Sequence, residues 1–319
     1  MKRQNKIITV ALAAACAALA GVTVATPAQA SILATEDFSG VTLSPNSTIA
    51  LQGVSDGTGW KSGTTWLANG SHPTTIPGYN VSDVTPLTGA DNNNYATGGY
   101  GYGLAYRYLD TTATGTFGSA GLVNNTTHHI GVAGTTILMS VLLEANKVSN
   151  SLQGAMVALG NNNSTSGSYA NAAVGDYTGY PTRTVPGDWV VSTTDGGPSP
   201  NHVYYTQSST AVTAGQATEL VMEIQYTTGT AANLSMWVNP AGYNSLHPTI
   251  PVATPDATLA STDATFSTVV FYSTNNSGAG ADFSNFVLAT PSSVPEPATL
   301  GLVAMGGLGL LLIGRRKQT

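Results

Sequence analysis

The feature that most constrains the fold of this chain is dense turn punctuation without helical periodicity. Among 319 residues there are 36 Gly and 16 Pro, and short apolar runs alternate with clusters of Asn, Thr and Ser. No stretch of the body sustains an apolar stripe with a period of 3.6 residues, whereas several runs alternate with a period of 2. Many short strands without intervening helices predict an all-β body, a β-sandwich of the jelly-roll type.

The clearest alternation falls in residues 135–144, 219–226 and 233–238, which we expect to form half-buried strands. Their apolar faces would carry Ile137, Met139, Val141 and Leu143, then Leu220, Met222, Ile224 and Tyr226, then Leu234, Met236 and Val238. Residues 227–232 would form a hairpin loop between the last two strands. Weaker strand candidates are residues 48–54, 64–68, 104–109, 155–159, 188–193, 265–272 and 282–289.

The N-terminus has the pattern of a secretory signal peptide, which we predict to span residues 1–30. Basic residues come first, an apolar Ala-rich run follows from Ile7 to Val24, and Ala28-Gln29-Ala30 supplies a small-x-small cleavage pattern. The alternative is an uncleaved membrane helix. The only cysteine, Cys16, lies inside the apolar run, so the exported body, residues 31–290, would hold no disulfide.

The charge of the body is strongly acidic. Residues 31–290 contain four basic side chains against 15 acidic ones, which gives a net charge of −11. An acidic surface repels phosphate backbones, so we expect no nucleic-acid partner.

The C-terminus, residues 291–319, has the pattern of a membrane anchor. Residues 298–314 carry no charge and would span about 25 Å as a helix, close to the lower limit for crossing a bilayer. Arg315, Arg316 and Lys317 follow directly and would stay on the cytoplasmic side, so the body would face outward. A buried C-terminal helix is the alternative. Pro295 and Pro297 would separate the predicted transmembrane helix from the body.

This tail resembles the PEP-CTERM sorting signal of Gram-negative bacteria. The resemblance rests on Val294, Pro295, Glu296 and Pro297, then the short Gly/Leu-rich span, then the basic end at 315–317. It implies recognition by an exosortase, a membrane transpeptidase-like enzyme, and cleavage near the Pro-Glu-Pro motif. The body would then pass from its membrane anchor to the cell surface or to the exopolysaccharide matrix.

The body itself resembles the laminin-G and concanavalin A-like jelly rolls of exported bacterial proteins. The features that carry this resemblance are the opening Glu36-Asp37-Phe38-Ser39-Gly40, the tryptophans Trp60 and Trp66, and the final strand at 282–289 leading into the tail. It implies a concanavalin A-like sandwich for residues 31–290.

Few residues of the body are arranged for catalysis. Glu219 and Glu223 lie four apart on one expected strand, about 13 Å from each other, which exceeds the roughly 5–9.5 Å of glycosidase acid/base pairs. We therefore expect both to face water. His128 and His129 would point to opposite faces and are poor co-ligands for a metal. Glu36 and Asp37 could ligate Ca²⁺ or form an ordinary turn, and we expect no cofactor.

The strongest functional hint is aromatic. Tyr95, Tyr100 and Tyr102 lie among Asn and Asp residues and could form a glycan-binding face, because aromatic rings stack on the apolar faces of sugars. The alternative is that these rings pack on strands or decorate a loop. We therefore expect a non-enzymatic surface or matrix protein associated with extracellular polysaccharide. The rival hypotheses are a glycan-active hydrolase or lyase and a purely structural module.

Overall fold

In the computed structural model, the described residues are 30–42, 48–51, 53–70, 80–82, 95–97, 101–145, 154–161, 171–176, 187–194, 202–275 and 281–291. Ala30–Ser292 forms one compact unit with its own hydrophobic core. The predicted body, residues 31–290, lies within this unit. The predicted signal peptide (1–30) falls outside the described residues except for Ala30, and the predicted tail (291–319) except for Pro291.

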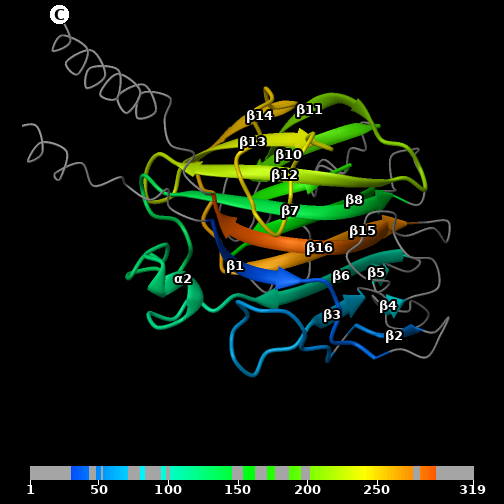
Figure 1. Cartoon of the computed structure of the whole chain (residues 1–319), viewed down its shortest axis with the longest axis horizontal. Helices are drawn as coiled ribbons and strands as arrows, with labels where there is room; N and C mark the ends of the chain where they lie inside the picture. Colours follow the sequence, from blue (N-terminus) through cyan, green and yellow to red (C-terminus); the bar gives the residue numbers. More distant parts are fainter. Residues whose placement is uncertain are drawn as a thin grey trace, which may run out of the picture. The chain divides into compact units, whose positions relative to one another are not determined.

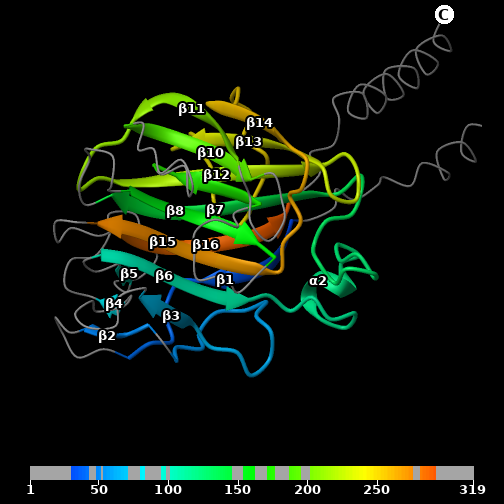
Figure 2. The same ribbon diagram turned by 180° about the vertical axis from the view of Figure 1, so that it is seen from behind.

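The described part of the chain is all-β, as the sequence predicts, and is arranged as two antiparallel sheets (Figures 1 and 2). The nine-stranded sheet has the order β14-β13-β12-β7-β16-β5-β4-β2, with β1 paired to β16. Its strands are β1 (Ser31–Glu36), β2 (Thr48–Ala50), β4 (Asn80–Ser82), β5 (Tyr95–Thr97), β7 (Thr136–Ala145), β12 (Ala217–Tyr226), β13 (Ala232–Val238), β14 (Ala257–Ser261) and β16 (Ala281–Thr290).

The seven-stranded sheet has the order β11-β10-β9-β8-β15-β6-β3 and lies nearest the viewer in Figure 2. Its strands are β3 (Leu67–Gly70), β6 (Gly101–Tyr108), β8 (Gly154–Gly160), β9 (Ala172–Gly175), β10 (Asp188–Thr194), β11 (Val203–Ala211) and β15 (Thr268–Asn275). Among the described residues, the only helix is α2 (Thr116–Ser119), which buries Phe117.

The three strongest strand predictions are confirmed as β7, β12 and β13. β12 pairs with β13 from Leu220↔Val238 to Tyr226↔Ala232, so the predicted hairpin exists, and β12 also pairs with β7. Their predicted apolar faces point into the core between the sheets, except Val238, which is partly buried against it. The aromatic centre of this core is Phe271 of β15, whose ring lies 4.7 Å from that of Trp66 and 5.0 Å from that of Phe283.

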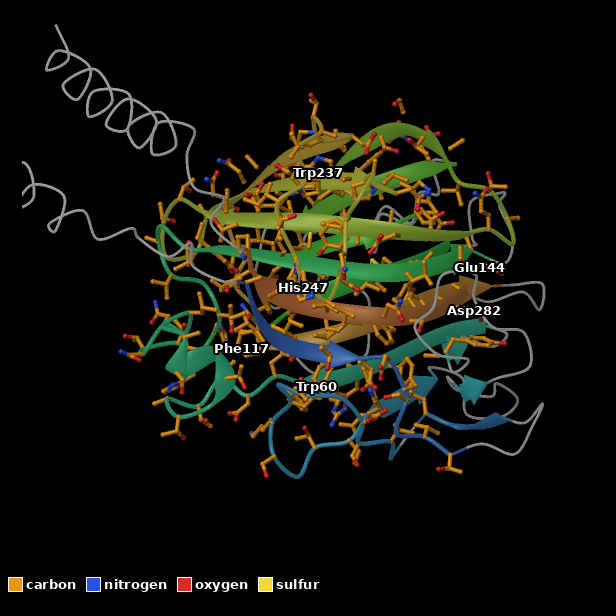
Figure 3. The ribbon with its side chains drawn as sticks, in the orientation of Figure 1. Trp60, Phe117, Glu144, Trp237, His247 and Asp282 are labelled. Atoms are coloured by element: carbon orange, nitrogen blue, oxygen red, sulfur yellow. The ribbon has the colours of Figure 1, made fainter. Side chains whose placement is uncertain are left out.

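The expectation of a half-buried strand is wrong for β7, because its outer face is buried as well. Leu138, Ser140 and Leu142 all face away from the core between the sheets, yet each is buried. Residues 239–256 account for part of this cover: the Trp237 indole donates to the Ala253 carbonyl over 2.8 Å. Burial raises the pKa of Tyr243 in the same segment to about 12. Figure 3 shows His247 of this segment in front of the sheet.

Candidate functional site

The most unusual polar group in the core is the carboxylate of Glu36, at the end of β1. Glu36 pairs with Phe286 of β16 and is 0% exposed. Its Oε2 accepts from the Trp66 indole over 2.7 Å and from Arg107 Nη1 over 3.0 Å, and its Oε1 accepts from the Phe38 amide over 3.2 Å. Buried charges are tolerated when they are paired and hydrogen-bonded, and Glu36 meets both conditions.

Arg107 enters the core from the opposite sheet. It sits between Ala105 and Leu109, which also point inward from β6 and the bridge that follows it, so the period of 2 aims its side chain at the core. Besides Glu36, its guanidinium donates to the backbone carbonyls of Asp56 and Thr64. Its Nε–H is buried and has no hydrogen-bond partner. The Glu36–Arg107 ion pair therefore links the two sheets through a guanidinium that retains an unused donor.

Trp60 covers this ion pair. The guanidinium carbon of Arg107 lies 4.7 Å from the centre of the Trp60 ring, within the range of a cation–π interaction. The Trp60 ring also lies 6.0 Å from that of Phe286 and 5.5 Å from that of Trp66, while its Nε1 donates to the Thr35 carbonyl over 3.0 Å. The indole is thus held by contacts around it and is only 8% exposed.

Burial shifts the ionisation of both partners in the pair. It raises the pKa of Glu36 to about 7, although the hydrogen bond from Trp66 and the charge of Arg107 act in the opposite direction. Burial also lowers the pKa of Arg107, and the charge of Glu36 opposes that change. The cost of removing both groups from water therefore dominates the electrostatics of the site.

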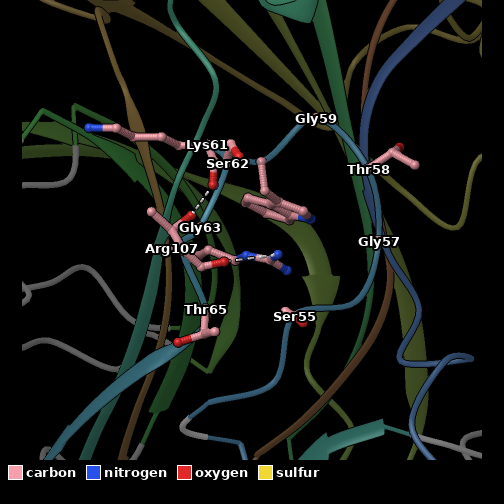
Figure 4. Close-up of a pocket in the computed structure, with 11 residues that line it drawn as sticks. Ser55, Gly57, Thr58, Gly59, Lys61, Ser62, Gly63, Thr65 and Arg107 are labelled. Atoms are coloured by element: carbon pink, nitrogen blue, oxygen red, sulfur yellow. Dashed lines mark hydrogen bonds between the residues drawn. The ribbon is translucent and has the colours of Figure 1, made fainter.

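A polar pocket of about 380 Å³ opens beside this pair (Figure 4). Its wall is the loop 55–65 and Arg107 contributes to its lining; the side chains that line it are mostly hydroxyl-bearing. Gly57 and Gly59 hold the loop against β1 with φ values of +75° and +79°. A Cβ at either position would overlap a backbone carbonyl oxygen of β1, so only glycine fits there.

The structure does not bring the predicted tyrosines onto one sheet. Tyr95 lies in β5 of the nine-stranded sheet, is 6% exposed and packs in a small cluster with Leu142. Tyr102 lies in β6 of the seven-stranded sheet. Tyr100 and all seven predicted sorting residues (Val294, Pro295, Glu296, Pro297, Arg315, Arg316 and Lys317) lie outside the described residues.

The acidic residues singled out in the sequence take structural positions. Glu36 accepts three N–H donors, and Asp37 accepts the Ser39 amide over 3.0 Å, as in an ordinary turn. Within the described part of the chain, no group of three or more His, Cys, Asp or Glu side chains is placed to hold a metal ion. Glu219 and Glu223 lie on the outer side of β12 and are half-buried rather than fully exposed; burial raises the pKa of Glu223.

A carboxylate pair that local sequence spacing does not reveal joins β7 and β16 of the nine-stranded sheet. Glu144 of β7 and Asp282 of β16 are direct cross-strand partners, and Figure 3 shows them close together. Burial, and then the negative charge of Asp282, raise the pKa of Glu144. Side chains directly opposite each other on antiparallel strands have Cβ atoms about 4.5–5.5 Å apart. The residues are 138 positions apart in the sequence, so local spacing could not reveal the pair.

Residues 293–317 match the family model of the PEP-CTERM protein-sorting motif. The C-terminus therefore carries this motif, which indicates a secreted protein sorted to the surface with processing by an exosortase. Among curated proteins, no sequence match to the chain was found. In the part of the chain that the structure describes, no helix is both long and apolar enough to span a bilayer.

Comparison with solved structures gives distant similarities only. Domain 4 of AbnA, a GH43 extracellular arabinanase from Geobacillus stearothermophilus, in complex with arabinotriose, is 9% identical, with 84% of this chain and 96% of that chain covered and a TM-score of 0.41. The Ca²⁺/Man3GlcNAc-bound exoplasmic domain of VIP36 is 12% identical, with 73% and 88% covered and a TM-score of 0.37.

The binding domain of botulinum neurotoxin DC, in complex with rat synaptotagmin II, is 10% identical, with 72% of this chain covered and a TM-score of 0.40. This chain spans only 44% of that structure's length. At these TM-scores the similarities assign no function to the chain.

Proposed function

We propose that this protein is a non-enzymatic surface or matrix protein whose body associates with extracellular polysaccharide. The observation that carries the proposal is the sorting motif at residues 293–317, because it directs the body to the compartment that contains such polysaccharides. In this account the body is a concanavalin A-like jelly roll. Residues 1–30 are removed as a signal peptide, and residues 298–314 hold the chain in the membrane until the exosortase acts.

The chemistry of the pocket supports binding rather than catalysis. No carboxylate lines it; Glu36 beneath it is enclosed and committed to three hydrogen-bond donors, and the carboxylate of Asp56 in the same loop accepts the Gly40 and Gly57 amides. A general acid or base must reach its substrate within hydrogen-bonding distance, and Glu36 is 0% exposed. Hydroxyl groups and loop amides, in contrast, are suitable partners for the hydroxyl groups of a sugar.

The sorting part of the proposal is tested by replacing Pro295, Glu296 and Pro297 together with Ala in the full chain, with Ser292→Ala as a neighbouring control. Cells are fractionated, and the mass of the protein is measured in each fraction. We expect the wild type and the control to appear outside the membrane fraction without the tail. The triple variant should stay in the membrane fraction at full mass. An identical distribution of all three proteins would contradict the proposal.

One observation favours a glycan-active enzyme as a second candidate, namely the Glu144–Asp282 pair. Retaining glycosidases hold two carboxyl groups about 5–5.5 Å apart, a spacing that direct cross-strand partners can provide. The raised pKa of Glu144 suits a general acid. Incubation with acidic and neutral polysaccharides should then release new reducing ends or unsaturated sugars. Glu144→Gln and Asp282→Asn would each abolish that release, whereas the binding proposal predicts no release by any of the three proteins.

A further inference from the structure

The pocket beside Arg107 is the place where the positive charge of the described body gathers. Lys61 and Arg107 are the only Lys or Arg residues among those that the structure describes, and both line this pocket. The same residues include 12 acidic side chains, so the field elsewhere is negative. Glu36 and Asp56 lie close to Arg107, so the exposed ammonium group of Lys61 is the main attraction for a negatively charged polymer, which most of this surface would repel.

Lys61 is able to take up a ligand. Its backbone is fixed, since its amide donates to the Tyr108 carbonyl over 3.0 Å and its carbonyl accepts the Thr64 amide over 3.1 Å. Its side chain is exposed, and the one ion pair found in the described part of the chain is that of Arg107 with Glu36. Figure 4 shows the Lys61 side chain extending away from Arg107. A four-carbon stem with free rotation lets this ammonium group close on an anion in the pocket.

Arg107 supplies a fixed charge beneath the pocket. Three of its N–H groups are committed to Glu36, Asp56 and Thr64, and these bonds prevent the guanidinium from moving. Its buried Nε–H has no partner, so the hydrogen-bonding capacity of the group is not exhausted. A fixed guanidinium and a mobile ammonium on one pocket are suited to a carboxylate, which both groups recognise.

The other side chains that line the pocket favour a hydroxylated ligand over an aromatic or lipid ligand. Ser62, Thr64 and Thr65 line the pocket together with loop backbone. Trp60 also lines the pocket, but its indole is only 8% exposed and contacts Arg107 and Phe286, so we expect polar contacts rather than ring stacking to hold the ligand. The volume of about 380 Å³ lies at the small end of ligand pockets, which range over roughly 300–1,000 Å³, and suits a short piece of a sugar chain.

We infer that this pocket binds a carboxylated sugar, a uronic acid unit of an acidic polysaccharide. The inference rests on the proposed association with polysaccharide and names its ligand class and its site. The ammonium group of Lys61 binds the carboxylate of the sugar, and the positive charge of Arg107 attracts it. The hydroxyl groups of the loop hydrogen-bond to the hydroxyl groups of the sugar ring. The rest of the acidic body keeps the polymer from lying flat on the surface, so the contact is confined to one or a few sugar units.

Gly63, at the pocket wall, allows a test with matched variants. Its φ is +72°, and a Cβ added there would meet nothing within 4 Å. Asp and Asn both tolerate this left-handed conformation better than other side chains and differ mainly in charge. Gly63→Asp places a negative charge at the pocket, whereas Gly63→Asn adds nearly the same volume without one. Gly215, with φ +69° and equally open surroundings, provides Gly215→Asp as a control for added charge elsewhere.

The compact unit of residues 30–292 is titrated by calorimetry with a trimer of galacturonic acid and with the neutral trimer of galactose. We expect the acidic trimer to bind and the neutral trimer to bind at least about tenfold more weakly. Gly63→Asp and Lys61→Gln should each weaken binding of the acidic trimer by about tenfold or more. Gly63→Asn and Gly215→Asp should change it by less than about threefold.

Equal affinity for the two trimers, or binding of the acidic trimer that Gly63→Asp leaves unchanged, overturns the inference. A second measurement, retention of the protein by the host's own exopolysaccharide, distinguishes failure of the uronic acid site from failure of the proposed function. If neither trimer binds but the polysaccharide retains the protein, the uronic acid site is wrong and the association stands. If the polysaccharide also fails to retain the protein, both are wrong.

Discussion

Asp176 follows β9 and provides a quantitative test of the energetics of this core. It is 0% exposed; its Oδ1 accepts the Ala155 amide over 2.5 Å, whereas its Oδ2 is buried without a hydrogen-bond partner. Burial raises the pKa of Asp176 to about 7, against the lowering effect of its backbone hydrogen bonds. We predict that Asp176→Asn, which keeps the shape and the accepting oxygen, changes the pH dependence of stability.

The size of the expected change in the free energy of unfolding follows from the rise of the Asp176 pKa above its ordinary value of 3.8. A rise of about three units corresponds to about 4 kcal/mol, at 1.36 kcal/mol per unit. Because the folded state holds the proton more tightly than the unfolded state, this stabilisation is complete below pH 4. It is lost as the pH rises through about 7. Asn does not titrate, so the variant gains about 4 kcal/mol relative to the wild type between pH 4 and pH 8.

The assay is urea unfolding of residues 30–292 at pH 4, 6 and 8, with the free energy of unfolding extrapolated to water. Asp188→Asn, at a half-buried carboxylate at the start of β10, controls for the loss of one negative charge. An effect of Asp176→Asn that is the same at pH 4 and pH 8 would show that Asp176 does not carry this linkage.

Two further predictions concern the pocket loop and the ion pair behind it. Gly59→Ala should destabilise the body by about 3 kcal/mol or more in urea unfolding, because its Cβ would overlap a backbone carbonyl of β1. Gly53→Ala, at an open position of similar φ, should cost only about 1 kcal/mol, and equal losses would contradict the packing argument. Acidic-trimer binding should strengthen severalfold between pH 8 and pH 6, because Glu36 takes up a proton and no longer neutralises Arg107. Asp56 also lies near this ion pair. In Glu36→Gln the affinity for the acidic trimer should not change over this pH range, and a persistent pH effect in that variant would assign the effect to another group.

The strands that the sequence predicted well are those whose pattern is dictated by the core. β12 and β13 alternate because only one of their faces packs between the sheets. β11 was not predicted, since most of it is exposed at the edge of its sheet, where Tyr204 is 52% exposed and hydrophobic alternation is not required. β9 was also missed, because Ala172-Ala173-Val174-Gly175 is too short to show a period.

The site was predicted less well than the fold, for a physical reason. The sequence marked Glu36 as a candidate ligand or turn residue, yet its function in the core depends on Arg107, 71 positions away on another sheet. One local signal was present: Arg107 occupies an inward position of an alternating strand, and a charge there requires a buried partner. The Tyr95–Tyr102 hypothesis relied on proximity in the sequence, and the chain passes from one sheet to the other between these residues.

The measurement that tests the central claim most directly is the molar mass of the host's exopolysaccharide during incubation with residues 30–292, followed by light scattering after size separation. A non-enzymatic binder predicts that the mass of the polysaccharide peak rises with protein concentration to a plateau and does not fall with time. A steady fall in mass would identify an enzyme acting on the chain, and an unchanged mass at every protein concentration would contradict any association with the polysaccharide.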